Sequence, residues 1–253
     1  MSCFIRMGMI RIESCGRTDV GLRRVNNEDA FVSSPEPGLL ALADGMGGAP
    51  SGEVASGIFS DTVRELISGV RPFAVEEPEE IVRRTFLLAH RRIRELAAME
   101  PEHRGMGCTG EMVVFTDDRY VVGHVGDSRI YLFRGGRLRQ VTKDHSFVQE
   151  QVDRGLLTPE QARVHALRHM ILRALGIDDA LAVDLFSGKA LPDDLFLLCS
   201  DGLTDMVGDQ LIEERLASDL SLGEKAEILV RDACDAGGRD NVTVVLGLVL
   251  HVD

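Results

Sequence analysis

Acidic side chains in this sequence stand where strongly apolar segments end or begin. Residues 39–43 lead into Asp44-Gly45, and residues 196–200 lead into Asp201-Gly202. Other acids flank apolar segments in the same way, namely Asp127, Asp240, and the adjacent Glu28 and Asp29. A single Asp-Gly pair is typical of a turn, and acids at strand ends are common. Five such groups beside apolar strands are harder to explain as turns and indicate a shared chemical purpose.

Carboxylates brought together at the ends of buried strands have a chemical requirement. They repel one another and lose hydration, so the group needs a cation to balance it. Oxygen ligands suit hard divalent ions such as Mg²⁺ or Mn²⁺. Glycine after Asp44 and after Asp201 lets a backbone carbonyl turn toward such an ion. The acids therefore predict a site for divalent metal ions.

The elements that must position these acids follow from the hydrophobic periodicity. Apolar segments of strand character occupy residues 38–43, 111–116, 120–125, 130–133, 195–199 and 242–250. Helical patterns occupy residues 51–68 and 79–99, and capping boxes at Thr158 and Ser221 predict two further helix starts. Strands outnumber helices, and short turns join them. We therefore predict an α+β fold with antiparallel sheets and helices packed on their outer faces.

Bulk properties narrow the function classes. The chain has 253 residues, with 28 Lys and Arg against 41 Asp and Glu, so its formal net charge is −13. Such an acidic surface argues against nucleic acid and anionic membranes as partners. No apolar run reaches the roughly 18 residues that a membrane span needs, and no secretion signal is recognisable, so we expect a cytoplasmic protein. Because no linker-like tract interrupts the patterns, residues 1–253 are expected to form one domain.

Motifs of other enzyme classes are either absent or stand in a sequence context that does not suit them. Residues 105–110 match the glycine pattern of a dinucleotide-binding turn, but a strand-like segment follows them where that turn needs a helix. The chain contains no G-x-S-x-G elbow and no G-K-[ST] phosphate loop. His165 and His169 have helical i, i+4 spacing without the glutamate of a zinc helix, and the five cysteines show neither a zinc nor a disulfide pattern.

An ordered set of short motifs spans nearly all of residues 18–250. They read GLRRVNNED at 21–29, ADGMGG at 43–48, SGEVAS at 51–56, VGDSR at 125–129, TKDHS at 142–146, RALG at 173–176, CSDGLTD at 199–205 and RDNVT at 239–243. In this order they resemble the metal-dependent protein phosphatases of the PPM, or PP2C, family in its compact bacterial form. The resemblance implies a four-layer α-β-β-α sandwich, in which antiparallel helices flank two central antiparallel β-sheets.

The resemblance also implies a set of metal ligands. These are Glu28, Asp44, the Gly45 carbonyl, Asp127, Asp201 and Asp240. Asp44 would bridge two ions, Mn²⁺ or Mg²⁺, with Glu28 and Gly45 on one of them. Asp201 and Asp240 would hold the other ion, and Asp201 would share a weaker third ion with Asp127.

Further roles follow for residues around the metals. By its spacing to residues 26–29, Arg24 rather than Arg23 would grip the substrate phosphate, a task that suits a planar guanidinium. Asp29 and Asn241 would support the ligands by hydrogen bonding. The flap, about residues 145–172, borders the active site in the family, varies among its members, and is a candidate for setting substrate choice.

The implied reaction is hydrolysis of phosphoserine or phosphothreonine in proteins. Two ions about 3.5–4 Å apart lower the pKa of a bridging water and clamp the phosphate for in-line attack, so no covalent phosphoenzyme is expected. The substrates would be phosphoproteins made by Ser/Thr kinases, and the enzyme a monomer.

One departure from the family concerns the general acid. Many bacterial members have a histidine directly after Met-Gly-Gly, and animal members have one directly after the first Asp-Gly. Ala49 and Met46 stand at these positions, so a histidine acid for the leaving alkoxide is missing at both. His124 and His145 are the nearest alternatives in sequence, and we interpret both as structural.

Two other functions fit the same motifs less well. A catalytically silent binding module on this fold has no need of Arg24 together with every metal ligand. A hydrolase of another phosphoester, such as a nuclease, fits poorly with a net charge of −13.

Overall fold

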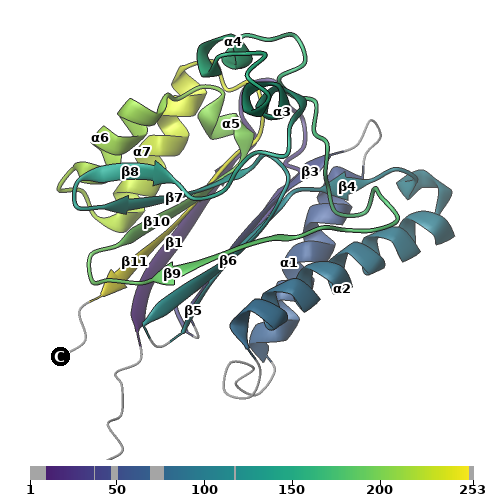
Figure 1. Ribbon diagram of the computed structural model, residues 1–253, viewed down its shortest axis with the longest axis horizontal. Coiled ribbons are helices and arrows are strands. Elements are labelled where there is room, and N and C mark those ends of the chain that lie inside the picture. Colours follow the sequence, from purple (N-terminus) through teal and green to yellow (C-terminus); the bar gives the residue numbers. More distant parts are fainter. Residues whose placement is uncertain (1–9, 37, 47–50, 69–76, 117, 251–253) are drawn as a thin grey trace, which may run out of the picture.

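Two antiparallel sheets form the centre of the molecule (Figure 1). The computed structural model describes residues 10–36, 38–46, 51–68, 77–116 and 118–250. In spatial order the first sheet contains β1 (Arg11–Asp19), β11 (Val242–Leu250), β10 (Leu195–Cys199), β7 (Arg129–Arg134) and β8 (Arg137–Gln140). The second contains β2 (Asp29–Ser34), β3 (Leu39–Met46), β5 (Gly110–Thr116), β6 (Arg119–Val125) and β9 (Asp184–Lys189), with the short β4 (Gly107–Cys108) paired to β3.

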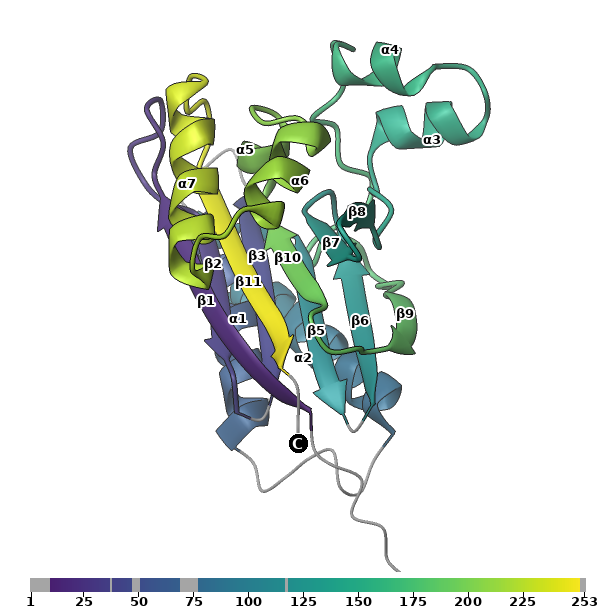
Figure 2. The same cartoon turned by 90° about the vertical axis from the view of Figure 1, so that its left-hand side faces the viewer.

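Helices cover the outer face of each sheet. Helices α1 (Gly52–Ser68) and α2 (Pro78–Met99) lie on the second sheet, and α2 is followed by the 3-10 turn η2 (Pro101–His103). Helices α5 (Asp201–Thr204), α6 (Asp209–Ala217) and α7 (Leu222–Asp235) lie on the first sheet (Figure 2). This is the four-layer α-β-β-α sandwich that the motifs implied.

The core is divided into three apolar layers. Side chains on one face of the second sheet pack against α1 and α2, around Phe59 and Phe86, whose ring centroids lie 5.2 Å apart. Those on one face of the first sheet pack against α6 and α7. The layer between the sheets includes Leu40, Leu42 and Phe196. All of residues 39–43 are buried, as expected of a strand covered on both sides.

The flap leaves the sandwich at one end and returns to its starting point. It carries α3 (Phe147–Asp153) and α4 (Pro159–Arg163), which stand beyond the ends of the sheets in Figure 2. Phe147 N–H donates to Met170 O at 2.8 Å, and Leu172 N–H donates to His145 O at 2.7 Å, so the two ends of the segment are joined. Both predicted capping boxes are present, with Thr158 before α4 and Ser221 before α7.

No helix in the part of the chain that the structure describes is both long enough and apolar enough to cross a bilayer.

Candidate functional site

The acids singled out in the sequence meet at the flap end of the sandwich. The antiparallel pairing of β2 with β3 places Asp29 directly opposite Asp44. Asp201 opens α5 just after β10, and Asp240 precedes the neighbouring strand β11. A cavity of about 470 Å³ lies there, lined by every predicted ligand and by the predicted phosphate-binding arginine: Arg24, Glu28, Asp44, Gly45, Asp127, Asp201 and Asp240.

Glycine after Asp44 has a steric reason that the sequence did not reveal. A Cβ atom on Gly45 would lie 2.3 Å from Gly52 O and 2.6 Å from Glu28 O, so no other residue fits between these backbone segments. Gly45 N–H donates to Glu28 O at 3.1 Å. The glycine thus keeps the Glu28 segment close to the end of β3.

Arg24 stands at the rim of the cavity, and Arg23 does not line it. Arg24 Nη2 donates to Asp240 Oδ2 at 2.7 Å, with the arginine side chain 48% exposed. The side-chain hydrogen bond to Asp240 raises the pKa of Arg24, so its guanidinium stays charged at the mouth of the site. A half-exposed guanidinium in this place is able to meet an incoming phosphate.

Asp29 and Asn241 lie behind the cavity wall and support it. Asn241 Oδ1 accepts from Glu28 N–H at 2.8 Å, while its amide nitrogen donates to Val20 O and Asn26 O. Asp29 Oδ2 accepts from two buried hydroxyl groups, Ser200 at 2.9 Å and Thr243 at 2.6 Å. Asp29 Oδ1 is buried without a partner among the described residues.

The electrostatics of the cluster fit divalent ions. Burial, with further repulsion from neighbouring carboxylates, raises the pKa of Asp44 and Asp201 well above the ordinary aspartate value. Burial likewise raises the pKa of Asp127 to about 7 and that of Asp29 to about 6. Buried carboxylates that are costly to ionise are balanced by a hard cation that binds their oxygen atoms. The donor set therefore suits Mg²⁺ or Mn²⁺.

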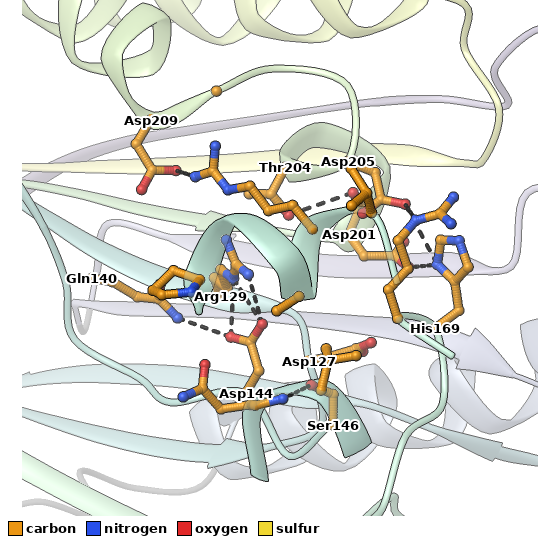
Figure 3. Close-up of a pocket in the computed structure, with 18 of the residues that line it drawn as sticks. Asp127, Arg129, Gln140, Asp144, Ser146, His169, Asp201, Thr204, Asp205 and Asp209 are labelled. Atoms are coloured by element: carbon orange, nitrogen blue, oxygen red, sulfur yellow. Dashed lines mark hydrogen bonds and ion pairs between the residues drawn. The ribbon is translucent and has the colours of Figure 1, made fainter. Parts of the chain in front are cut away.

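A second cavity of about 680 Å³ adjoins the first beneath the flap. The two share Asp127, Asp201 and Asp205 from the sandwich and His169 from the flap (Figure 3). His169 Nδ1 lies 4.0 Å from Asp201 Oδ2 and 3.4 Å from Asp205 Oδ2. Sequence analysis gave neither His169 nor Asp205 a role, and residues 165–169 do not form the helix that their spacing allowed. The only signal for Asp205 was its place in the CSDGLTD motif.

Comparison with known proteins gives the family. A family model described as protein phosphatase 2C matches residues 23–230. The chain belongs to the protein phosphatase 2C family. It is 41% identical over 241 residues to the serine/threonine protein phosphatase PstP of Mycobacterium tuberculosis, covering 94% of this chain and 45% of PstP. It is 37% identical over 232 residues to the protein phosphatase PhpP of Streptococcus pneumoniae, covering 90% of this chain and 94% of PhpP.

A solved structure supports the same family fold. The crystal structure of the PstP catalytic domain in complex with two manganese ions matches with a TM-score of 0.88 at 38% identity, covering 96% of this chain and all of that one. The chain thus spans less than half the length of full PstP while matching its catalytic domain throughout.

Met46 and Ala49 stand at the two positions where other members of the family have a histidine. Met46 lines the smaller cavity, and Ala49 lies outside the described residues. His124 and His145 have both ring nitrogens engaged: Glu111 and Lys143 O hold His124, whereas Gly126 N–H, Arg173 and Asp184 surround His145. Burial lowers the pKa of His145 to about 4. Neither ring lines either cavity.

Proposed function

We propose that this chain is a metal-dependent protein phosphatase that hydrolyses phosphoserine and phosphothreonine in proteins. The observation that carries the proposal is the convergence of Arg24 and all the predicted carboxylates on one cavity. The similarity to PstP and PhpP, both named protein phosphatases, supports the reaction and its substrate class.

The metal ligands are proposed as the sequence predicted them. Asp44 would bridge two Mn²⁺ or Mg²⁺ ions, with Glu28 and the Gly45 carbonyl on one of them and Asp201 with Asp240 on the other. Asp127 and Asp201 would hold a third ion. When bound, such ions lower the pKa of a shared water and neutralise charge on the phosphate oxygens. The two manganese ions named for the PstP complex support this assignment.

The chain's own residues would bind, orient and shield. Arg24 would leave Asp240 to hold phosphate oxygens, since charge-assisted hydrogen bonds from a guanidinium to phosphate are strong. Asn241 and Asp29 would keep Glu28 and Asp44 in place. Met46, Ile171 and Met206 supply apolar wall around the reacting group.

The cavity lining also supports direct attack by water. Its described lining residues include no Ser, Thr or Cys. Carboxylates can also act as nucleophiles, but all of the lining carboxylates except Asp205 would be engaged as metal ligands. The work of the lining residues is to hold ions and phosphate, which matches hydrolysis without an enzyme-bound intermediate.

The test is turnover of p-nitrophenyl phosphate and of a phosphothreonine peptide with Mn²⁺, by the wild type and by Asp44→Asn. We expect turnover that requires added Mn²⁺, and its loss in the variant. A purified, folded wild type that shows no metal-dependent turnover of either substrate would contradict the proposal. Turnover of nucleic acid in preference to the phosphopeptide would favour a nuclease.

Several finer statements stay predictions from the sequence. These are that the substrates are made by Ser/Thr kinases, that the protein is a cytoplasmic monomer, and that residues 1–253 act as one domain.

A further inference from the structure

A buried glutamate and a buried histidine form a pair outside the two cavities. Glu111 on β5 and His124 on β6 stand directly opposite each other in the sheet. Glu111 Oε1 and His124 Nδ1 are 2.7 Å apart, and both side chains are 0% exposed. Alternate residues of the same strands, Val113 and Val122, belong to the apolar layer between the sheets, so the pair faces that layer too. Placing such a pair in an apolar layer is costly, and an apolar pair would pack there at less cost.

The hydrogen-bond directions fix where the protons lie. The carbonyl of Lys143 only accepts, so His124 Nε2 carries a proton and donates to it at 2.8 Å. A second proton lies between Nδ1 and Glu111 Oε1, because two acceptors do not attract each other. Glu111 Oε2 is buried and has no partner within the described part of the chain. Burial raises the pKa of Glu111 to about 8, consistent with a proton that the pair shares.

The pair reaches the metal ligands through His145. The rings of His124 and His145 lie against each other, with centroids 4.4 Å apart. His145 holds Gly126 on both sides: its N–H donates to Gly126 O at 2.7 Å, and its Nδ1 accepts from Gly126 N–H at 3.0 Å. Gly126 has a φ of +117° and no room for a Cβ, which would lie 2.6 Å from the Thr109 side chain. The backbone that carries Asp127 is therefore set by His145.

The same histidine lies at the base of the flap. Leu172, where the flap ends, donates its N–H to His145 O at 2.7 Å. Arg168 and His169, a few residues earlier, line both cavities. One residue thus joins the loop that bears Asp127 to the returning end of the flap.

We propose that Glu111 and His124 form a positioning pair that holds Asp127 and the flap base in place, acting through Lys143 and His145. The pair fixes the Lys143 carbonyl by a directed hydrogen bond and supports the His145 ring by stacking. Two apolar side chains would fill the same space without fixing that carbonyl. The proposal rests on the proposed function only in taking Asp127 as a metal ligand.

The first test measures backbone amide hydrogen exchange in the metal-free protein, for the wild type and Glu111→Leu, which leaves His124 Nδ1 without its partner. We expect the amides of Gly126, His145 and Leu172 to exchange about tenfold faster in the variant, because their hydrogen bonds open locally. Amides in β10 and β11 should be unchanged. Uniform acceleration of all amides, or no change at the three positions, overturns the proposal.

His90→Gln is the matched control. His90 is also buried, at 6% exposure, and its Nδ1 also accepts a backbone N–H, that of Gly176 at 3.0 Å. We expect this variant to accelerate exchange at Gly176 and to leave Gly126 and Leu172 unchanged. If it accelerates the same amides as Glu111→Leu, the pair has only a general packing role and the proposal fails.

The second test uses equilibrium dialysis to measure how many Mn²⁺ ions bind and with what affinity. In Glu111→Leu we expect the affinity of the weakest site to fall about tenfold, the effect known for residues that orient metal ligands, with the tighter sites unchanged. Equal weakening of all sites, or none, counts against the pair. If the wild type binds no Mn²⁺, the proposed function fails, while the exchange pattern still decides this inference. If Glu111→Leu does not fold, His124→Leu probes the same pair, with the same pattern expected.

Discussion

The two ends of strand β10 carry aspartates with opposite surroundings. Asp194, just before the strand, is 1% exposed and accepts from Arg134 Nε at 2.6 Å, Arg134 Nη2 at 2.5 Å and Leu191 N–H at 2.7 Å. Asp201, just after it, has the ring of His169 at 4.0 Å as its only ion-pair partner among the described residues. The charge of a buried carboxylate is balanced when an arginine of the fold pairs with it. A buried carboxylate without such a partner requires a bound cation.

For these two aspartates, the comparison distinguishes an acid paired within the fold from a proposed metal ligand. The two aspartates flank the same strand, and both lie where its run of apolar side chains ends. What distinguishes them is the cation that the fold supplies. The predictions below test whether that difference has the expected consequences, beginning with the largest effect.

Replacing Asp201 with asparagine should mainly reduce activity, whereas replacing Asp194 with asparagine should mainly reduce stability. Asp201→Asn should reduce Mn²⁺-dependent turnover about a thousandfold, because loss of a metal ligand removes several kcal/mol of transition-state stabilisation. Asp194→Asn should leave turnover nearly unchanged and lower the free energy of unfolding by about 1–3 kcal/mol. Steady-state kinetics and urea unfolding measure the two quantities. The same kinetic loss in both variants would remove the distinction.

Arg24 gives an intermediate case, because Asp240 is a proposed metal ligand that does have an arginine partner. Arg24→Ala should lower kcat/KM about a hundredfold by removing charged hydrogen bonds to phosphate. Arg23→Ala, at the neighbouring position, is the control and should change kcat/KM less than threefold. Similar losses in the two variants would show that only general positive charge matters.

Asp29 tests the layer behind the ligands. Asp29→Asn keeps the shape of the side chain and removes its charge, so we expect Mn²⁺ affinity to fall about tenfold. The hydroxyl groups of Ser200 and Thr243 should still hold the asparagine in place, so the melting temperature should change little. Calorimetric titration with Mn²⁺ measures the affinity, and an unchanged value would contradict the supporting role.

The smallest effect is a pH dependence of stability in the metal-free protein. The pKa of Asp29 is raised to about 6 and that of Asp127 to about 7, and both Asp44 and Asp201 are raised as well. The folded chain therefore holds these protons more tightly than the unfolded chain, whose aspartates titrate near about 3.9. The stabilisation is complete below that value and is lost as pH rises through the folded pKa values.

We expect the metal-free protein to melt at least about 3 °C lower at pH 8 than at pH 5.5, from on the order of 1 kcal/mol of lost stability. Saturating Mn²⁺ should reverse the trend, because ions favour the carboxylate form. A metal-free melting temperature that rises with pH would contradict the raised pKa values.

The strands that sequence analysis found and those it missed differ in burial. Strand β3 and strand β10 are continuous apolar runs, and both were predicted. Strands β1 and β8 have mostly exposed or half-buried side chains and stand at the edges of their sheet. Their pairing depends on partners supplied by the rest of the fold, so local periodicity carries little signal for them.

The site was predictable to the extent that it is made of motif residues. Glu28, Asp44 and Asp240 were grouped as a cation site from their types and their positions next to strands, and their individual roles came from the family resemblance. His169 was considered only as part of a zinc helix, which its context did not support, because only the folded path brings residue 169 beside Asp201. The pairing of Glu111 with His124 likewise required the register of β5 and β6, which the sequence does not contain.

The pairing of β1 with β11 has a consequence for the order of events during protein synthesis. The first and last described strands form nine consecutive residue pairs, from Arg11 with Leu250 to Asp19 with Val242. Asp240 lies immediately before β11, so neither the first sheet nor the acid cluster can be completed before residues 240–250 have left the ribosome. A nascent chain that still holds these residues in the ribosome would therefore lack the complete acid cluster, and a chain released before them would expose β1 as an unpaired strand to other proteins.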